Sequence, residues 1–202
     1  MPGRKAAEAT RREQILRAAH KVALARGIDG LTVRAVAAKA RLSHGLVLFH
    51  FKRKDQLGLA LLDRVLATTV SPGIPDIIEA IPDPRERLLA LFRQELHRLS
   101  AEPHRVRLLL EYWARGAHNA EIRKKIKAGL DGYRAVFQGL AEEALRAHAG
   151  RSGRATADGV AAAAVSLILG YPVQAMIDPG QLDGGEYLAT VAGLVGHPAA
   201  AA

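Results

Sequence analysis

The sequence predicts an all-α protein of about nine helices. Apolar residues recur at helical spacing along most of the 202 residues, and no segment shows the alternation typical of a strand. Aromatic residues make up only 4% of the chain while Ala and Leu dominate, which favours packed helices over sheets. Capping residues precede many of the periodic runs, and Gly or Pro follows several of them.

The first three helices are expected to form a helix-turn-helix unit. The first is about 16 to 20 residues long, starts at a capping box at Thr10 or a turn earlier among Ala6 to Ala9, and stops at Gly27. Thr32 and Ser43 then cap two short helices separated by a turn of about three residues. The longer first helix is expected to lie across both short ones.

Six further helices are expected along the rest of the chain. Their starts are marked by acidic, Asn or Thr caps or by Pro at the first helical position, and they fall at Lys54-Asp55, Asp83-Pro84, Glu102-Pro103, Asn119, Thr156 and Asp183. The stretch "GRSGR" at 150–154 is expected to be a loop.

The positive charge is confined to the first third. Residues 1–70 hold 14 Lys and Arg against 5 Asp and Glu, whereas residues 71–202 hold 15 of each. A basic unit joined to a neutral one indicates that the first third meets a polyanion, although a basic surface can equally serve solubility. We therefore predict a DNA-binding domain over residues 1–55 and a second helical domain over residues 56–202.

The segment "RLSHGLVLFHFKRKD" at 41–55 has the chemistry of a DNA-reading helix. Ser43 can turn its hydroxyl and the free N–H groups of the first turn toward a phosphate, and Gly45 permits close backbone approach. The expected groove-facing residues are His44, Gly45, Leu46 and Leu48, and the expected phosphate contacts are Ser43, His50, Lys52 and Lys54. Alternatively, the apolar residues of this segment belong to the core, and the basic residues that follow them are the solvated start of the next helix. Val47, Phe49 and Phe51 are expected to be core residues in either case.

Residues 12–57 resemble the DNA-binding domain of the TetR family of bacterial transcription regulators. The matching positions run in order and spacing through Ile15, Ala18, Gly27, Thr32, Val33, Ala37, Ala40, Ser43, Gly45, His50, Phe51, Lys54 and Leu57. The resemblance implies that Thr32 and Arg34 also touch DNA, and that Arg4, Lys5, Arg11 and Arg12 form a basic arm that follows the minor groove or is simply solvated. The segment "VQAMIDPGQLDGGEYL" is similar to the end of regulators grouped with the choline-responsive repressor BetI.

Two positions depart from the family pattern. Arg41 stands where the family has Gly in the turn, so Arg41 is expected in a left-handed conformation at a cost of roughly 1 kcal/mol. Leu48 stands where the family commonly has a phosphate-binding Tyr, which leaves open whether Leu48 makes an apolar base or sugar contact instead.

The neutral two-thirds is expected to hold an effector pocket and a dimer interface. Pocket candidates are aromatic or polar residues at helical spacing, which could equally be core: Phe92, Leu96, Tyr112, Trp113, Tyr133, Phe137, Gln174 and Met176. Interface candidates lie on the last two helices, where small side chains allow two helices to approach closely. The alternative is that these residues are buried inside the monomer. The candidates are Val160, Ala164, Leu167, Ile168, Tyr187, Leu188, Val191, Leu194 and Val195.

The resemblance implies a homodimeric repressor that binds a palindromic DNA operator and is released by an unknown small-molecule effector. No catalytic residue, metal site or cofactor is expected, since the chain has no Cys, no paired metal-ligand spacing and no phosphate-binding or nucleophile motif. Neither a signal peptide nor an apolar run of membrane length is expected, which predicts a cytoplasmic protein. A membrane-surface role is the rival, but the face opposite the basic residues carries Ala rather than Trp, Phe or Leu.

Overall fold

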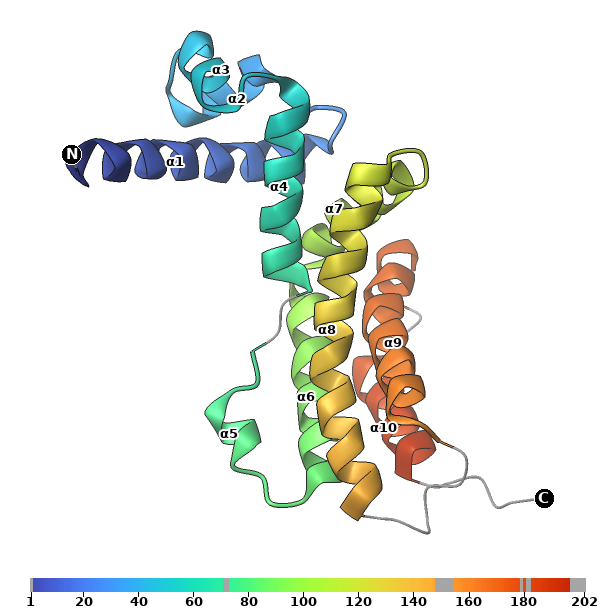
Figure 1. Cartoon of the computed structure of the whole chain (residues 1–202). Helices are drawn as coiled ribbons and strands as arrows, with labels where there is room; N and C mark the ends of the chain where they lie inside the picture. The colour runs from blue at the N-terminus through green and yellow to red at the C-terminus, as the bar shows by residue number, and fades with distance from the viewer. Residues whose placement is uncertain (1, 71–72, 148–154, 179, 181–182, 197–202) are drawn as a thin grey trace. The chain divides into compact units, whose positions relative to one another are not determined.

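The computed structural model of the chain describes residues 2–70, 73–147, 155–178, 180 and 183–196, and the side chains from 7 to 193 within these ranges (Figure 1). Over these residues it contains helices and no strand, which confirms the all-α class. The ten helices are α1 (Pro2–Arg26), α2 (Val33–Ala40), α3 (His44–Phe51), α4 (Lys54–Thr69), α5 (Asp76–Glu79), α6 (Pro84–Ala101), α7 (Pro103–Gly116), α8 (Ala120–Ala147), α9 (Ala157–Ile177) and α10 (Gly184–Gly196). The helix absent from the sequence prediction is α5, whose single turn is too short to show a helical repeat.

The chain divides into two compact units. Unit 1 comprises Met1–Val70 and Arg107–Gly129, and unit 2 comprises Ser71–Val106 and Leu130–Ala202. One boundary follows Val70 just after α4, and the other two fall inside α7 and α8, so none lies at the end of the helix-turn-helix. The assignment of DNA binding to residues 1–55 and of effector binding to residues 56–202 stays a prediction.

The turn between α2 and α3 has the geometry that the sequence predicts. The Thr32 hydroxyl accepts a hydrogen bond from the N–H of Ala35 at 3.1 Å, and the Ser43 hydroxyl accepts one from Leu46 at 3.2 Å. Arg41 adopts φ 56° and ψ 46°, so the expected left-handed residue is confirmed. These caps fix where α3 begins and therefore which of its residues face outward.

The core of unit 1 forms where α1 packs against α2 and α4, and α2 and α4 pack against α3. Its buried members include apolar residues from each of these four helices: Ile15, Ala19, Val36, Val47, Phe51, Leu57, Leu61, Leu62 and Val65. Gln14 donates from its side-chain amide to the carbonyl of Ala40 at 2.9 Å, which ties α1 to the end of α2.

The prediction that Phe49 is a core residue is wrong. Its side chain is 70% exposed, whereas Val47 and Phe51 are buried. Val47 and Phe51 are four residues apart and share one face of α3, while Phe49 lies about 200° around the helix from Val47. Phe49 therefore joins the outer face of α3.

Three side chains of α7 hold the turn that joins α1 to α2. Arg107 donates to the carbonyl of Leu24 at 2.5 Å, the Glu111 carboxylate accepts from the N–H of Ile28 at 2.7 Å, and Arg115 pairs with Asp29. We call Arg107, Glu111 and Arg115 the α7 clamp. The left-handed Gly27 (φ 69°) lies inside it, because a Cβ there would come within 3.0 Å of the Glu111 carboxylate.

Unit 2 is built around α6, which packs against α9 and α5. Arg87 of α6 pairs with Glu143 of α8 at 2.7 Å. The Tyr187 hydroxyl donates to the carbonyl of Leu167 at 3.0 Å and its ring lies 4.9 Å from that of Tyr171, which joins α10 to α9. The interhelical contacts of this unit are therefore both apolar and polar.

Helix α9 is long and apolar. Its most apolar window of 18 residues has a mean hydropathy of 1.8, and only 33% of that window is buried within the chain. By length and composition, the expectation that no apolar segment of membrane length occurs is therefore wrong. Gly, Ser and Gln interrupt the apolar residues of α9, but they do not lower its mean hydropathy enough to exclude it. A single such helix is weak evidence for a membrane segment, since helices that pack on protein pass the same test.

Candidate nucleic-acid interface

The start of α3 is an exposed helix end. Ser43, His44 and Gly45 are exposed, and Leu46 and Leu48 are half-buried at the edges of the same face. With Phe49, these residues present hydrogen-bonding and apolar groups on one side of a short helix, while Val47 and Phe51 anchor the other side in the core. An anchored helix with such an outer face can enter a major groove.

Gly45 is open to the outside. A Cβ built at this position would meet nothing within 4 Å, so the fold places no packing demand for glycine here. Positive φ is not the reason either, since Gly27 is the glycine with positive φ among the described residues. The absent side chain thus leaves the backbone of α3 free to approach an external surface closely.

The exit from α3 carries the basic residues. Lys52 and Lys54 are exposed, and His50 is half-buried with its ring 5.3 Å from that of Phe49 in an edge-to-face arrangement. Lys52 has φ 39° and reverses the chain between α3 and α4. Two ammonium groups at a tight turn beside α3 are suited to phosphate contacts.

The start of α2 contributes a second polar edge. Thr32 is exposed and its hydroxyl caps the helix, while Arg34 is exposed. Both therefore lie where the resemblance implies DNA contacts, on a helix N-terminus whose dipole favours a phosphate.

Part of the expected basic arm has a structural role. Arg11 and Arg12 lie within α1; the Arg12 guanidinium sits 4.3 Å from the centre of the Phe51 ring and donates to the carbonyl of His50 at 3.4 Å. Arg12 thus links α1 to the end of α3 while it stays exposed. The side chains of Arg4 and Lys5 lie outside the described residues.

Family models match both parts of the chain. The model described as "Bacterial regulatory proteins, tetR family" matches residues 15–61, and the one described as "BetI-type transcriptional repressor, C-terminal" matches residues 84–197. The chain belongs to the TetR family of bacterial transcription regulators. Proteins of this family are generally not enzymes, and the recognition made from residues 12–57 is confirmed.

Curated relatives agree with the family. The HTH-type transcriptional regulator "in dhlA 5'region" of Xanthobacter autotrophicus is 30% identical over 178 residues, which cover 85% of this chain and 82% of that protein. The HTH-type transcriptional regulator BetI of Stenotrophomonas maltophilia is 30% identical over 125 residues, which cover 62% of this chain and 64% of that protein. This chain is thus a TetR-family transcriptional regulator.

Solved structures share the fold. A transcriptional regulator from Saccharomonospora viridis, solved in complex with choline, superposes with a TM-score of 0.75 at 20% identity and covers 94% of this chain and 97% of its own. FadR of Bacillus subtilis, solved in complex with stearoyl-CoA, gives a TM-score of 0.72 at 19% identity, with 91% and 96% covered.

The eight pocket candidates of this TetR-family regulator do not share one environment. Phe92, Leu96, Tyr133 and Phe137 are buried in unit 2, whereas Tyr112 and Trp113 belong to unit 1. The Tyr112 hydroxyl donates to the carbonyl of Gly58 on α4 at 2.8 Å, and Trp113 is 41% exposed. Gln174 is exposed and Met176 is half-buried.

Sequence reasoning missed a buried polar cluster in unit 2. Glu95 is 1% exposed; its carboxylate accepts from the Arg98 guanidinium at 2.5 Å and from the Tyr133 hydroxyl at 3.0 Å. Burial raises the pKa of the Tyr133 phenol, and the Glu95 charge beside it raises the pKa further. The sequence does hold a signal, because Glu95 lies midway between Leu91 and Leu99 on the apolar stripe of α6.

The interface candidates divide by burial. Ala164, Ile168 and Val191 are buried inside the chain, whereas Val160, Leu167, Tyr187 and Leu188 are half-buried, and the side chains of Leu194 and Val195 lie outside the described residues. The exposed face of α9 carries mostly small and polar residues, which are Gly159, Ala163, Ser166 and Gln174, with half-buried Gly170 between them, and it ends at Ile177, which is 86% exposed.

Proposed function

We propose that this regulator is a homodimeric repressor that binds a palindromic DNA operator and is released by a small-molecule effector. It acts by binding rather than catalysis, in the cytoplasm and without membrane insertion. The observation that carries the proposal is the exposed face of α3, anchored from behind by Val47 and Phe51.

DNA reading is assigned to two helix starts and one turn. His44, Leu46 and Phe49 face base edges, and Gly45 brings the backbone close. Polar residues around these base-reading residues bind the phosphates, namely Thr32, Arg34, Ser43, His50, Lys52 and Lys54. Leu48 stands half-buried at the edge of this face and makes an apolar contact with a base or sugar.

A dimer places one such unit in each of two successive major grooves, which requires recognition helices about 34–36 Å apart. The dimer is supported by α9, because most of the most apolar part of this helix is not buried within one chain. Its exposed Ala163 and Ser166, with Gly170 on the same face, permit close approach of a second helix. We place the interface on this face and on the half-buried Leu167 and Leu188.

The effector is assigned to the interior of unit 2. Phe92 and Leu96 flank Glu95 on α6, and Phe137 contacts Tyr133 edge to face with ring centres 5.5 Å apart. This combination of apolar walls and a few fixed polar groups is typical of small-molecule sites. The solved neighbours hold ligands as different as choline and stearoyl-CoA, so the fold alone names no effector.

Coupling runs through α7 and α8, each of which has residues in both units. In unit 1 the α7 clamp holds the turn before α2, and Lys125 of α8 pairs with Asp63 of α4 at 2.6 Å. An effector that shifts either helix therefore changes how α2 and α4 are held. DNA and effector then weaken each other's binding by the same factor.

The test is selection of bound sequences from a random duplex pool at two salt concentrations. A His44→Ala/Leu46→Ala variant runs alongside, with His97→Ala/Ile77→Ala as the matched control, because His97 and Ile77 are exposed residues outside unit 1. We expect a palindromic consensus from the wild type and the control and none from the α3 variant.

Recovery of no consensus, with wild type and α3 variant equally sensitive to salt, would overturn the proposal. It would mean that unit 1 binds polyanions through charge alone.

A further inference from the structure

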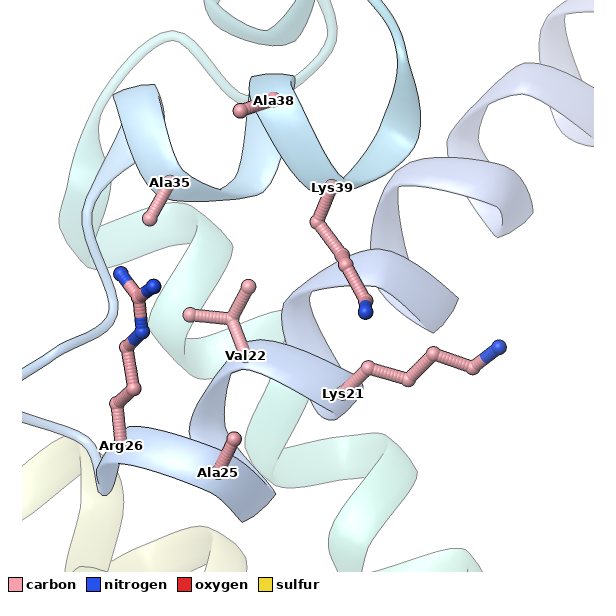
Figure 2. A pocket seen from close by; sticks show the side chains of 7 residues that line it. All are labelled: Lys21, Val22, Ala25, Arg26, Ala35, Ala38 and Lys39. Atoms are coloured by element: carbon pink, nitrogen blue, oxygen red, sulfur yellow. The ribbon is translucent and has the colours of Figure 1, made fainter.

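A surface groove lies between α1 and α2 on unit 1. Its volume is about 370 Å³, and its lining comes from Lys21, Val22, Ala25 and Arg26 of α1 and Ala35, Ala38 and Lys39 of α2 (Figure 2). None of the residues proposed to contact DNA lines it. The groove is therefore a separate feature of the DNA-binding unit.

The groove is cationic and uncompensated. Lys21, Arg26 and Lys39 contribute three positive charges, and no acidic residue lines the groove. None of the three forms an ion pair with another described residue, whereas nearby Asp29 is paired with Arg115. A concave surface with one sign of charge concentrates counter-ions of the other sign.

The floor of the groove is apolar. Ala25 and Ala38 expose their methyl groups, Ala35 is half-buried and Val22 closes the bottom at 6% exposure. Figure 2 shows Arg26 and Lys39 reaching from the two helices into the space on either side of Val22. A ligand that satisfies both parts needs an anionic head for the two cations and a short apolar tail for the methyl groups.

We propose that this groove binds a small amphipathic anion, a carboxylate with a short aliphatic tail. The carboxylate lies between the Arg26 guanidinium and the Lys39 ammonium, with Lys21 at the rim, and the tail covers Ala25, Ala35 and Ala38. Charge-assisted hydrogen bonds supply the orientation. A bare phosphate of a duplex would leave the methyl groups uncovered, which is why a duplex is the less favoured occupant. The site is distinct from the effector site proposed in unit 2.

The test follows the alanine methyl groups by NMR in the full chain, without DNA, so that it does not depend on the proposed operator binding. The probe is sodium hexanoate, compared with hexan-1-ol, hexyltrimethylammonium and sodium phosphate. We expect saturable shifts of the Ala25, Ala35 and Ala38 methyl signals with hexanoate alone. Equal shifts with hexanol or with phosphate would overturn the proposal, because the site would then need only one half of the ligand.

Variants assign the binding to the groove. Arg26→Gln/Lys39→Gln is expected to weaken hexanoate binding by at least about tenfold, since both charge-assisted contacts are lost. Arg93→Gln/Lys124→Gln removes two exposed cations elsewhere and is expected to change nothing. Unchanged hexanoate binding by the groove variant would refute the site.

A random duplex gives the last arm of the test. The proposal fails if hexanoate has no effect, the duplex shifts the same methyl signals, and the groove variant weakens the salt dependence of duplex binding. The groove would then be a contact for DNA phosphates.

Discussion

Gly45→Ala is expected to stabilise the protein while weakening operator binding. The added methyl group meets nothing within 4 Å in the folded chain, and Gly45 is the second residue of α3. Alanine is favoured over glycine by roughly 0.5–1 kcal/mol inside a helix, and we take about 0.5 kcal/mol because the first turn is only partly constrained. That corresponds to a rise in Tm of about 1–2 °C for a chain of this size.

The same methyl group points toward the surface assigned to DNA. If the α3 backbone approaches the duplex at van der Waals distance, the methyl group displaces it, and operator affinity should fall at least about tenfold, or about 1.4 kcal/mol. Thermal unfolding and fluorescence anisotropy with the selected operator measure the two effects on one preparation.

The matched control is Gly139→Ala. Gly139 is an exposed helical glycine of α8 with equally open space around it, so alanine there should also stabilise while operator affinity stays unchanged. Wild-type operator affinity in Gly45→Ala would show that the start of α3 does not approach DNA, and the assignment of α3 as the reading helix would then be wrong.

Three further outcomes follow from the described contacts. Ala163→Glu places a charge on the exposed face of α9 and should convert the dimer into monomers, as measured by sedimentation velocity. Ala135→Glu, at an exposed position of α8, should leave the dimer intact. If both variants stay dimeric, the interface does not lie on this face of α9. Arg41→Gly should raise the free energy of unfolding by roughly 0.5–1 kcal/mol in urea titrations by removing the left-handed Arg, and a loss of stability would contradict the strain assigned to it. Burial raises the pKa values of Tyr112 and Tyr133 above the value of about 10 that a tyrosine has in the unfolded chain. Above about pH 10 the unfolded state therefore binds fewer protons than the folded state. The free energy of unfolding should then fall by about 1.4 kcal/mol per pH unit for each of the two residues. Tyr112→Phe/Tyr133→Phe should flatten that decline, and an unchanged slope would mean that the two hydroxyls are not buried as described.

Local signals in the sequence predicted most of the fold. Thr32 and Ser43 cap helices where expected because capping depends on a side chain and the backbone three residues later. The left-handed Arg41 was predicted from the resemblance, because Arg41 stands where the family has Gly in the turn. Helical spacing alone also separates Val47 and Phe51 from Phe49, so the outward position of Phe49 agrees with the period of the helix.

Contacts between distant segments were not predictable. Glu111 and Ile28 are 83 positions apart, and nothing in either local sequence signals that a carboxylate will accept from that N–H group. The Glu95 cluster likewise needs α6 and α8 side by side before Tyr133 can donate. The residues proposed to contact DNA lie close together in the sequence, so local signals can predict their exposure. The residues proposed for the effector site come from distant segments, and local signals do not predict how such segments pack.

The α7 clamp bears on how members of this family can be cut and recombined. A fragment that ends at Val70 keeps every residue assigned to DNA but loses Arg107, Glu111 and Arg115, and with them the carboxylate that satisfies the N–H of Ile28. Unit 1 is thus discontinuous in sequence, and an excised version that keeps these contacts would have to carry residues 107–129 on a linker. A chimaera that replaces residues 1–70 of this chain would need a turn at positions 27–30 that the α7 clamp can hold, so the segment proposed to bind DNA should be exchanged together with this junction.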